Sequence, residues 1–275
     1  MSEAFRPPGE ILSYYEGGAE SGRLEGAGAL ELLRTQDILR RWLPAPPAVI
    51  VDVGGGPGVY ARWLSACGYE THLRDVSPRH VAEARAASAS RQHALASADV
   101  ADARRLDLRD ATADAMLLLG PLYHLTDRSD RVAALREARR VLRPGGILVA
   151  AAISRFASLL DGLRSRFLDD PDFARIVEED LRNGQHRNPG GHPYWFTTSY
   201  FHRPEELGTE MQEAGLFALA TLAVEGPGWL LADLPQRLAD PDRAAQLLGA
   251  LRAIESEPAL MGVSAHLLAI GRRAI

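Results

Sequence analysis

The sequence predicts an α/β protein in which helices flank a doubly wound, mostly parallel sheet of seven strands. Short segments rich in Val, Ile and Leu alternate with amphipathic helical segments, which is the pattern of successive βαβ units. The first of these strands runs directly into a glycine-rich loop and a helix, as at ligand-binding turns of such sheets. We expect a single domain over residues 1–275.

A helix is predicted first, at residues 30–43, because Leu32, Leu39 and Leu43 recur at helical spacing and three prolines follow. Five strands and three further helices come next. The strands are 48–53, 70–75, 95–98, 113–119 and 147–153, and the helices are 59–67, 78–89 and 130–142. Right-handed crossovers place the carboxyl ends of parallel strands at one edge, so we expect the ligand there.

The rest of the chain should cover that edge. Residues 1–43 are expected to form a helical cap, residues 48–153 the cofactor-binding core, and residues 154–202 a lid, since loops of that length are seldom passive. Residues 203–275 should hold a helix and two final strands, at 216–224 and 262–271, with a helical segment inserted between them.

The loop after the first strand indicates the ligand. A dinucleotide fingerprint needs a third glycine where this chain has Val59, so the pattern here is Asp52-x-Gly54-x-Gly56-x-Gly58, with Gly55 inside it. An acid beside the loop would repel a phosphate and attract an ammonium group. This favours S-adenosylmethionine, which carries an amino group and a sulfonium but no phosphate.

Further motifs follow the loop in order. They are Asp75 at the end of the second strand, Ala101-Asp102-Ala103 after the third, the segment from Leu118 to Leu125 after the fourth, and Leu142-Arg143-Pro144-Gly145-Gly146 before the fifth. Together with the glycine loop, they resemble the motifs of class I S-adenosylmethionine-dependent methyltransferases of the small-molecule type. The resemblance covers most of the chain and implies the Rossmann-like fold of that family.

The resemblance also implies roles for individual residues. Asp75 would hold the ribose hydroxyls of the cofactor and Asp102, beside Ala103, the adenine amino group. Asp99 could replace Asp102 if the register of the third strand slips. Leu119 and Gly120 would line the methionine part and the transfer site. Asp52 would hold the amino group or orient the loop.

Catalytic groups are less clearly marked. Tyr14 or Tyr15 could contact the sulfonium through a ring face. A hydroxyl acceptor would need a base, for which His124 and His202 are the candidates, whereas an amine acceptor needs only to be unprotonated. The histidine spacings do not predict a metal site.

Composition limits the acceptor. The chain has a net charge of −5 and one cysteine, Cys67, so neither a nucleic-acid partner nor a disulfide is expected. No apolar run suits a membrane and no leader pattern is seen, so we expect a cytoplasmic protein; a homodimer is compatible with the sequence. The leading hypothesis is methylation of an O or N atom of a small molecule. A catalytically silent cofactor-binding regulator and a nicotinamide-dependent oxidoreductase are the alternatives.

Overall fold

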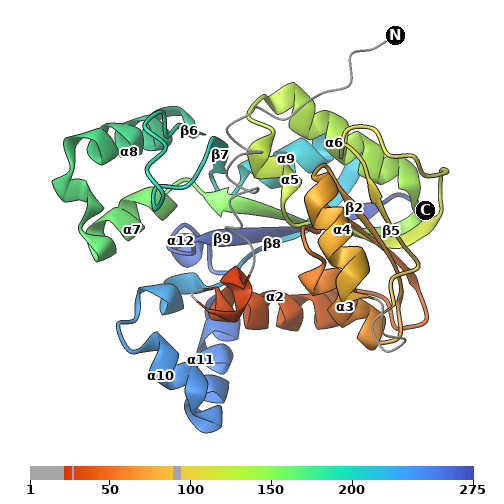
Figure 1. Cartoon of the computed structure of the whole chain (residues 1–275), viewed down its shortest axis with the longest axis horizontal. Coiled ribbons are helices and arrows are strands. Elements are labelled where there is room, and N and C mark those ends of the chain that lie inside the picture. The colour runs from red at the N-terminus through yellow and green to blue at the C-terminus, as the bar shows by residue number, and fades with distance from the viewer. Residues whose placement is uncertain (1–21, 27, 89–93) are drawn as a thin grey trace.

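A computed structural model describes residues 22–26, 28–88 and 94–275 of the chain, with one sheet at the centre (Figure 1). Seven strands form its main part in the order β3-β2-β1-β4-β5-β9-β8. Their bounds are β1 Val49–Val53, β2 Glu70–Asp75, β3 Ser97–Val100, β4 Ala113–Leu118, β5 Leu142–Ser154, β8 Leu216–Ala223 and β9 His266–Arg273. Of these seven, β9 alone runs in the direction opposite to the other six, which confirms the predicted doubly wound, mostly parallel sheet.

Helices cover both faces of this sheet because side chains alternate along each strand. In β1, Ile50 belongs to the core beneath two helices of one face, and Val51 belongs to the core beneath two helices of the other. The first pair is α2 Ala29–Trp42 and α3 Val59–Ala66, and the second is α6 Arg128–Val141 and α9 Glu206–Glu213. Figure 1 shows these pairs below and above the sheet.

The segment after β5 forms a unit of its own at the carboxyl edge of the sheet (Figure 1, left). Its elements are α7 Ala157–Ser165, the short helix η3 Phe167–Asp169, α8 Pro171–Asn183, β6 Gln185–His186 and β7 Ser199–His202. Phe173, Ile176 and Trp195 lie in a separate small core within it. The strands β6 and β7, which the sequence did not predict, join it to the sheet: β7 pairs with the last two residues of β5.

Four short helical elements lie between β8 and β9. They are η4 Gly226–Leu230, α10 Leu234–Ala239, α11 Pro241–Ile254 and α12 Pro258–Met261. The buried side chain of Arg34 fastens α2 to this region, because it binds the Glu255 carboxylate at 2.5 Å and the Val224 carbonyl oxygen at 3.0 Å. Among the described helices, we find none with both the length and the apolar character needed to cross a membrane.

Three predicted elements differ from the structure. The last strand, predicted at residues 262–271, is β9 at His266–Arg273, because residues 262–265 form a turn after α12. The third strand lies two residues later than predicted, since His72 pairs with Ser97 and Asp75 with Val100. This edge strand leaves Val100 exposed, so its hydrophobic pattern is weak. The predicted turn at residues 143–146 lies within β5, as a bulge opposite Ala113 and Ala115 of β4 with Gly145 at φ 80°.

Candidate functional site

The carboxyl edge of the sheet holds a cavity between the ends of β1, β2 and β4 and helix α2. Most of the side chains and glycines selected from the sequence line this sheet-edge cavity. They are Asp52, Gly54, Gly55, Gly56, Asp75, Asp102, Ala103, Leu119, Gly120 and His124. The fold therefore gathers residues from four separate loops at one place, as the strand order predicts.

The glycine loop forms one wall of this cavity, and its conformation excludes side chains. Gly54 has φ 70°, and a Cβ there would lie 2.6 Å from Cδ of Pro121. Gly56 has φ 54° but faces open space, because the nearest atom to its Cβ position would be Nδ1 of His80, at 4.0 Å. The backbone at Gly56 is therefore bare toward the cavity, which lets a ligand approach closely.

Asp52 is a buried acid without a side-chain partner. It is 0% exposed, neither carboxylate oxygen makes a hydrogen bond to a described side chain, and the backbone N–H of Ala61 is the one group that lowers its pKa. Burial and the nearby charge of Asp75 raise the pKa of Asp52 to about 7. A buried carboxylate that lines a cavity suits a cationic ligand, because the positive charge of the ligand would offset the cost of burying the ionised carboxylate.

Asp75 is held at the mouth of the loop by backbone amides. Its carboxylate accepts hydrogen bonds from the N–H groups of Gly56 and Ser77, each at 2.8 Å, and Nδ1 of His80 lies 3.4 Å away. Ser77 also caps α4, Pro78–Ala87, by accepting a hydrogen bond from His80 N–H. The remaining lone pairs of Asp75 are available to ligand hydroxyls.

Asp102 reaches the cavity and Asp99 does not. The Asp99 carboxylate lies outside, 3.0 Å from both the Arg74 and the Arg85 guanidinium groups. Asp102 lines the cavity and binds the Arg104 guanidinium at 2.7 Å. Although the third strand lies two residues later than predicted, the loop after it still brings Asp102 to the sheet-edge cavity.

His124 ends the short helix α5, Pro121–His124, and lines the cavity. Its Nδ1 lies 3.3 Å from the carbonyl oxygen of Thr198, so this nitrogen carries the proton and donates. Burial lowers the pKa of His124 to about 4. The imidazole is therefore neutral at physiological pH.

Two of the selected residues lie elsewhere. Gly58 is the N-terminal cap of α3 with φ 85°, and its Cβ position faces Ala84 rather than the cavity. His202 is 0% exposed and outside the cavity, because β7 turns it toward α9, where Nε2 lies 3.4 Å from the Glu210 carboxylate. Tyr14 and Tyr15 lie outside the described residues.

The sequence analysis missed part of the cavity wall. Glu31 and Thr35 of α2, Tyr60 of α3 and His266 of β9 also line it. For His266 the sequence offers a weak indication of a functional role, since it is a polar residue at the start of an apolar strand. Glu31 had none, because a glutamate in the first turn of a helix is ordinary.

A second cavity adjoins the first beneath the segment after β5, and we refer to it as the lid cavity. Arg23, Tyr123 and His266 line both cavities. Half of the other residues that line the lid cavity are aromatic, namely Phe173, Tyr194, Trp195, Phe196, Phe201 and Trp229. The two cavities therefore adjoin at these three residues; carboxylates line the sheet-edge cavity, and aromatic side chains are concentrated in the lid cavity.

Comparisons with known proteins agree with this geometry. Residues 51–150 match the family model described as a methyltransferase domain. A ubiquinone/menaquinone biosynthesis C-methyltransferase from Acidiphilium cryptum is 38% identical over 115 residues, 41% of this chain and 45% of that protein. A probable tRNA methyltransferase 9B from Homo sapiens is 29% identical over 54% of this chain and 32% of that protein. The matches span about half the length of the first curated relatives, or less.

A solved structure supports the fold over the full chain. The Haloferax volcanii complex of the Trm112 methyltransferase activator with a putative methyltransferase aligns with a TM-score of 0.62 at 17% identity, over 99% of this chain and 100% of that chain. At this identity the likeness concerns the fold alone. Together, the family match identifies residues 51–150 as a methyltransferase domain, and the structural likeness shows that the chain has the fold of class I S-adenosylmethionine-dependent methyltransferases.

Proposed function

We propose that this protein binds S-adenosylmethionine in the sheet-edge cavity and transfers its methyl group to an O or N atom of a small organic molecule in the lid cavity. The observation that carries the proposal is that the two cavities adjoin, since Arg23, Tyr123 and His266 line both of them. Aromatic walls and partial enclosure suit a small organic acceptor.

The residues of the sheet-edge cavity fit the cofactor chemically. The unpartnered carboxylate of Asp52 would attract the cationic methionine end, and the bare backbone at Gly56 admits close contact. Asp75 would accept hydrogen bonds from the ribose hydroxyls, and Asp102 would accept one from the adenine amino group. Leu119 and Gly120 would line the space near the transfer point.

The bound cofactor supplies an activated methyl group, so the main task of the protein is alignment. An acceptor atom must approach the methyl carbon on the side opposite to sulfur, and holding it there replaces a bimolecular encounter with a pre-aligned one. Tyr123 lies where the two cavities meet and His124 lies beside it on the same short helix, so both would orient the acceptor. With a pKa of about 4, His124 is a weak base, and we assign it a positioning role.

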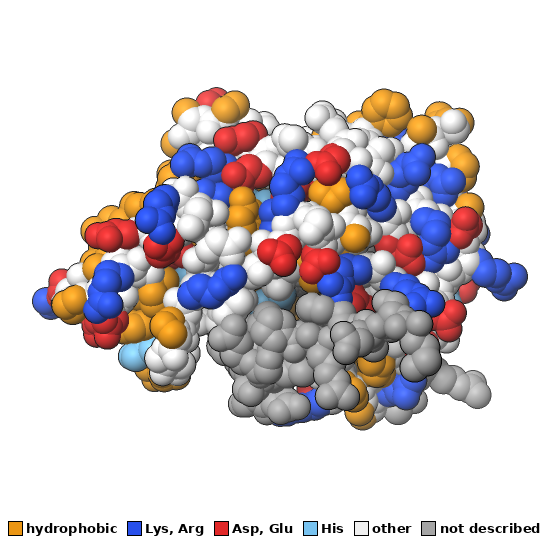
Figure 2. Space-filling view, turned by 90° about the horizontal axis from the view of Figure 1, so that it is seen from above, with side chains coloured by type: hydrophobic (Ala, Val, Ile, Leu, Met, Phe, Trp, Pro, Cys, Tyr) orange, Lys and Arg blue, Asp and Glu red, His pale blue; other side chains and the backbone are white. Residues whose placement is uncertain are grey.

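Nucleic acid is the main competing acceptor class, because one relative is named as a probable tRNA methyltransferase. An RNA-binding protein usually has a basic stripe, whereas the net charge here is −5. On the face shown in Figure 2, basic and acidic side chains are interspersed over the described surface. These observations favour a small acceptor. The C-methylation named for the quinone-biosynthesis relatives is a further chemistry that aromatic walls would admit.

The test is incorporation of a labelled methyl group. The protein is incubated with methyl-labelled S-adenosylmethionine and either a low-molecular-weight metabolite extract or total RNA, and label is followed in each fraction. We expect label in small molecules, and nuclear magnetic resonance of the product would identify the methylated atom. Label confined to RNA would overturn the proposed acceptor class.

Binding measurements separate the non-methylating alternatives. Calorimetry with S-adenosylhomocysteine and with NADH should show binding of the first only. Tight binding of S-adenosylhomocysteine with no methylation of either extract would favour a silent cofactor-binding regulator. Binding of NADH alone would favour an oxidoreductase.

A further inference from the structure

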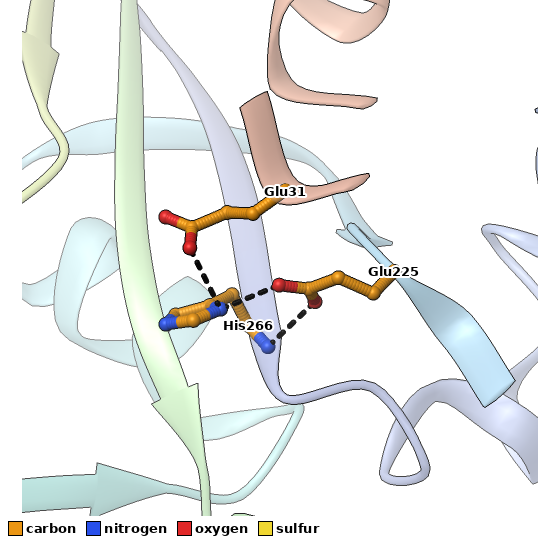
Figure 3. A group of neighbouring side chains, drawn as sticks. All are labelled: Glu31, Glu225 and His266. Carbon is orange, nitrogen blue, oxygen red and sulfur yellow. Dashed lines mark hydrogen bonds and ion pairs between the residues drawn. The ribbon is translucent and has the colours of Figure 1, made fainter. Parts of the chain in front are cut away.

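A charged cluster lies where the two cavities meet (Figure 3). Glu31 comes from the first turn of α2, Glu225 directly precedes η4, and His266 is the first residue of β9. Nδ1 of His266 lies 2.6 Å from the Glu225 carboxylate and 3.8 Å from that of Glu31. Glu225 and His266 both lie far from Glu31 along the chain, so only the fold brings the three residues together.

The orientation of the His266 ring is fixed. Glu225 accepts hydrogen bonds from both the Nδ1 and the backbone N–H of His266, and from the Ser264 hydroxyl at 3.0 Å. Both carboxylates lie on the Nδ1 side, and Figure 3 shows Nε2 at the opposite edge of the ring. The side chain is 24% exposed and lines both cavities, and no described residue makes a hydrogen bond to Nε2.

The surrounding charges keep this ring protonated. Burial by itself lowers the pKa of His266, but Glu31 and Glu225 outweigh burial and the opposing charge of Arg23, and raise the pKa to about 9. At neutral pH, Nε2 is therefore an N–H donor with a positive charge behind it.

A divalent metal ion is a poorer occupant of this cluster. Both oxygens of Glu31 already accept hydrogen bonds from Arg23, and both oxygens of Glu225 accept bonds from His266 or Ser264. A metal ion would also require Nδ1 to lose its proton. The cluster is arranged to hold a charged imidazole rather than a cation.

We propose that His266 binds the reacting oxygen of the acceptor through Nε2–H, and that the acceptor is an aromatic molecule with an acidic hydroxyl that reacts as its anion. This inference rests on the proposed function and deepens it. The aromatic walls of the lid cavity would hold the ring, and His266 lines both that cavity and the sheet-edge cavity, where the methyl donor would bind. A charge-assisted hydrogen bond from an imidazolium favours the ionised hydroxyl.

The balance of the reaction follows from this arrangement. The hydroxyl proton leaves to solvent when the acceptor binds, because His266 already holds its own proton. The oxyanion then supplies the electron pair of the new oxygen–carbon bond. The electrons of the broken sulfur–carbon bond remain on sulfur, which becomes a neutral thioether.

A coloured phenol tests the proposal without turnover. 4-Nitrophenol, whose neutral and ionised forms absorb at different wavelengths, is titrated with protein saturated with S-adenosylhomocysteine over a range of pH. We expect the apparent pKa of the bound dye to be lower than that of the free dye by at least about one unit. The affinity for the ionised dye should fall as His266 loses its proton near pH 9.

Variants assign the effect to the cluster. His266→Gln should abolish the shift in the dye. Glu225→Gln keeps a hydrogen-bonding partner but removes a charge, so it should reduce the shift. His72→Gln, on β2 and outside both cavities, is the matched control and should keep it. A shift that survives His266→Gln, or a wild-type protein that binds the dye in its neutral form or not at all, would overturn the inference.

The two proposals fail in different ways. If calorimetry shows that the wild-type protein does not bind S-adenosylhomocysteine, the proposed function itself is wrong. If S-adenosylhomocysteine binds and the dye is not ionised, only the role of His266 and the acidic acceptor are wrong.

Discussion

Replacing Asp52 by Asn should stabilise the protein without ligand and weaken its binding of the cofactor. Asp52 is buried without a side-chain hydrogen-bonding partner, and its pKa in the folded protein is raised from 3.8 to about 7. Below pH 3.8 the group is protonated in both states, and above about pH 7 it is ionised in both. Between these values only the folded state retains the proton, so stability falls as pH rises.

The size of this effect follows from the shift. A rise of about three pKa units corresponds to about 4 kcal/mol of stability lost across that window. Asn carries no charge but leaves a buried amide that costs about 1–3 kcal/mol. We therefore expect Asp52→Asn to raise the free energy of unfolding by about 1–3 kcal/mol above pH 7, and to have no such effect near pH 4.

Urea unfolding of both proteins between pH 4 and pH 8.5 measures this difference. In the wild type, S-adenosylmethionine should stabilise the protein more as Asp52 ionises, whereas in Asp52→Asn the stabilisation should depend little on pH. Asp169→Asn removes an exposed aspartate and serves as the control. If the free energy of unfolding depended on pH equally in Asp52→Asn and in the wild type, the assignment of an unpartnered buried carboxylate would be refuted.

Two further predictions concern Asp75 and Glu210. Asp75→Ala should weaken S-adenosylhomocysteine binding by about 100-fold or more in calorimetry, because charge-assisted bonds are each worth about 1.5–3 kcal/mol. The control is Asp99→Ala, at the end of the neighbouring strand but outside the cavity, which should change this affinity by less than about twofold. An equal loss in both variants would contradict the ribose role. Glu210→Ala should lower the free energy of unfolding by about 3–5 kcal/mol in urea, since it leaves the buried Arg131 guanidinium, now 2.7 Å from the Glu210 carboxylate, without its partner. A loss below about 1 kcal/mol would show that Arg131 finds another partner.

Much of the fold could be predicted because the signals are local. Buried parallel strands consist of apolar runs, and Ser77 before Pro78 marks a helix start that the structure contains. The third strand was misplaced because it lies at an edge with little burial. The strands β6 and β7 are two and four residues long and depend on pairing with β5 and each other, so no local pattern indicates them.

The site was predictable where motifs follow strands, since strand ends meet at one edge. Asp52, Asp75 and Asp102 reach the sheet-edge cavity for this reason. His202 could not be placed in the same way. In sequence it is a histidine before a helix, and only packing shows that it faces Glu210 rather than a cavity.

The sequence alone predicted the main sheet, the methyltransferase-like fold and the edge at which the motif residues gather, because strand period, glycine geometry and motif order are local properties of the chain. The tertiary structure decided which charged side chains lie close to one another. Glu31, Glu225 and His266 come from two ends of the chain, and their mutual distances set the protonation of the imidazole at the boundary of the two cavities. Electrostatic interactions depend on separation in space and on burial, neither of which sequence spacing specifies.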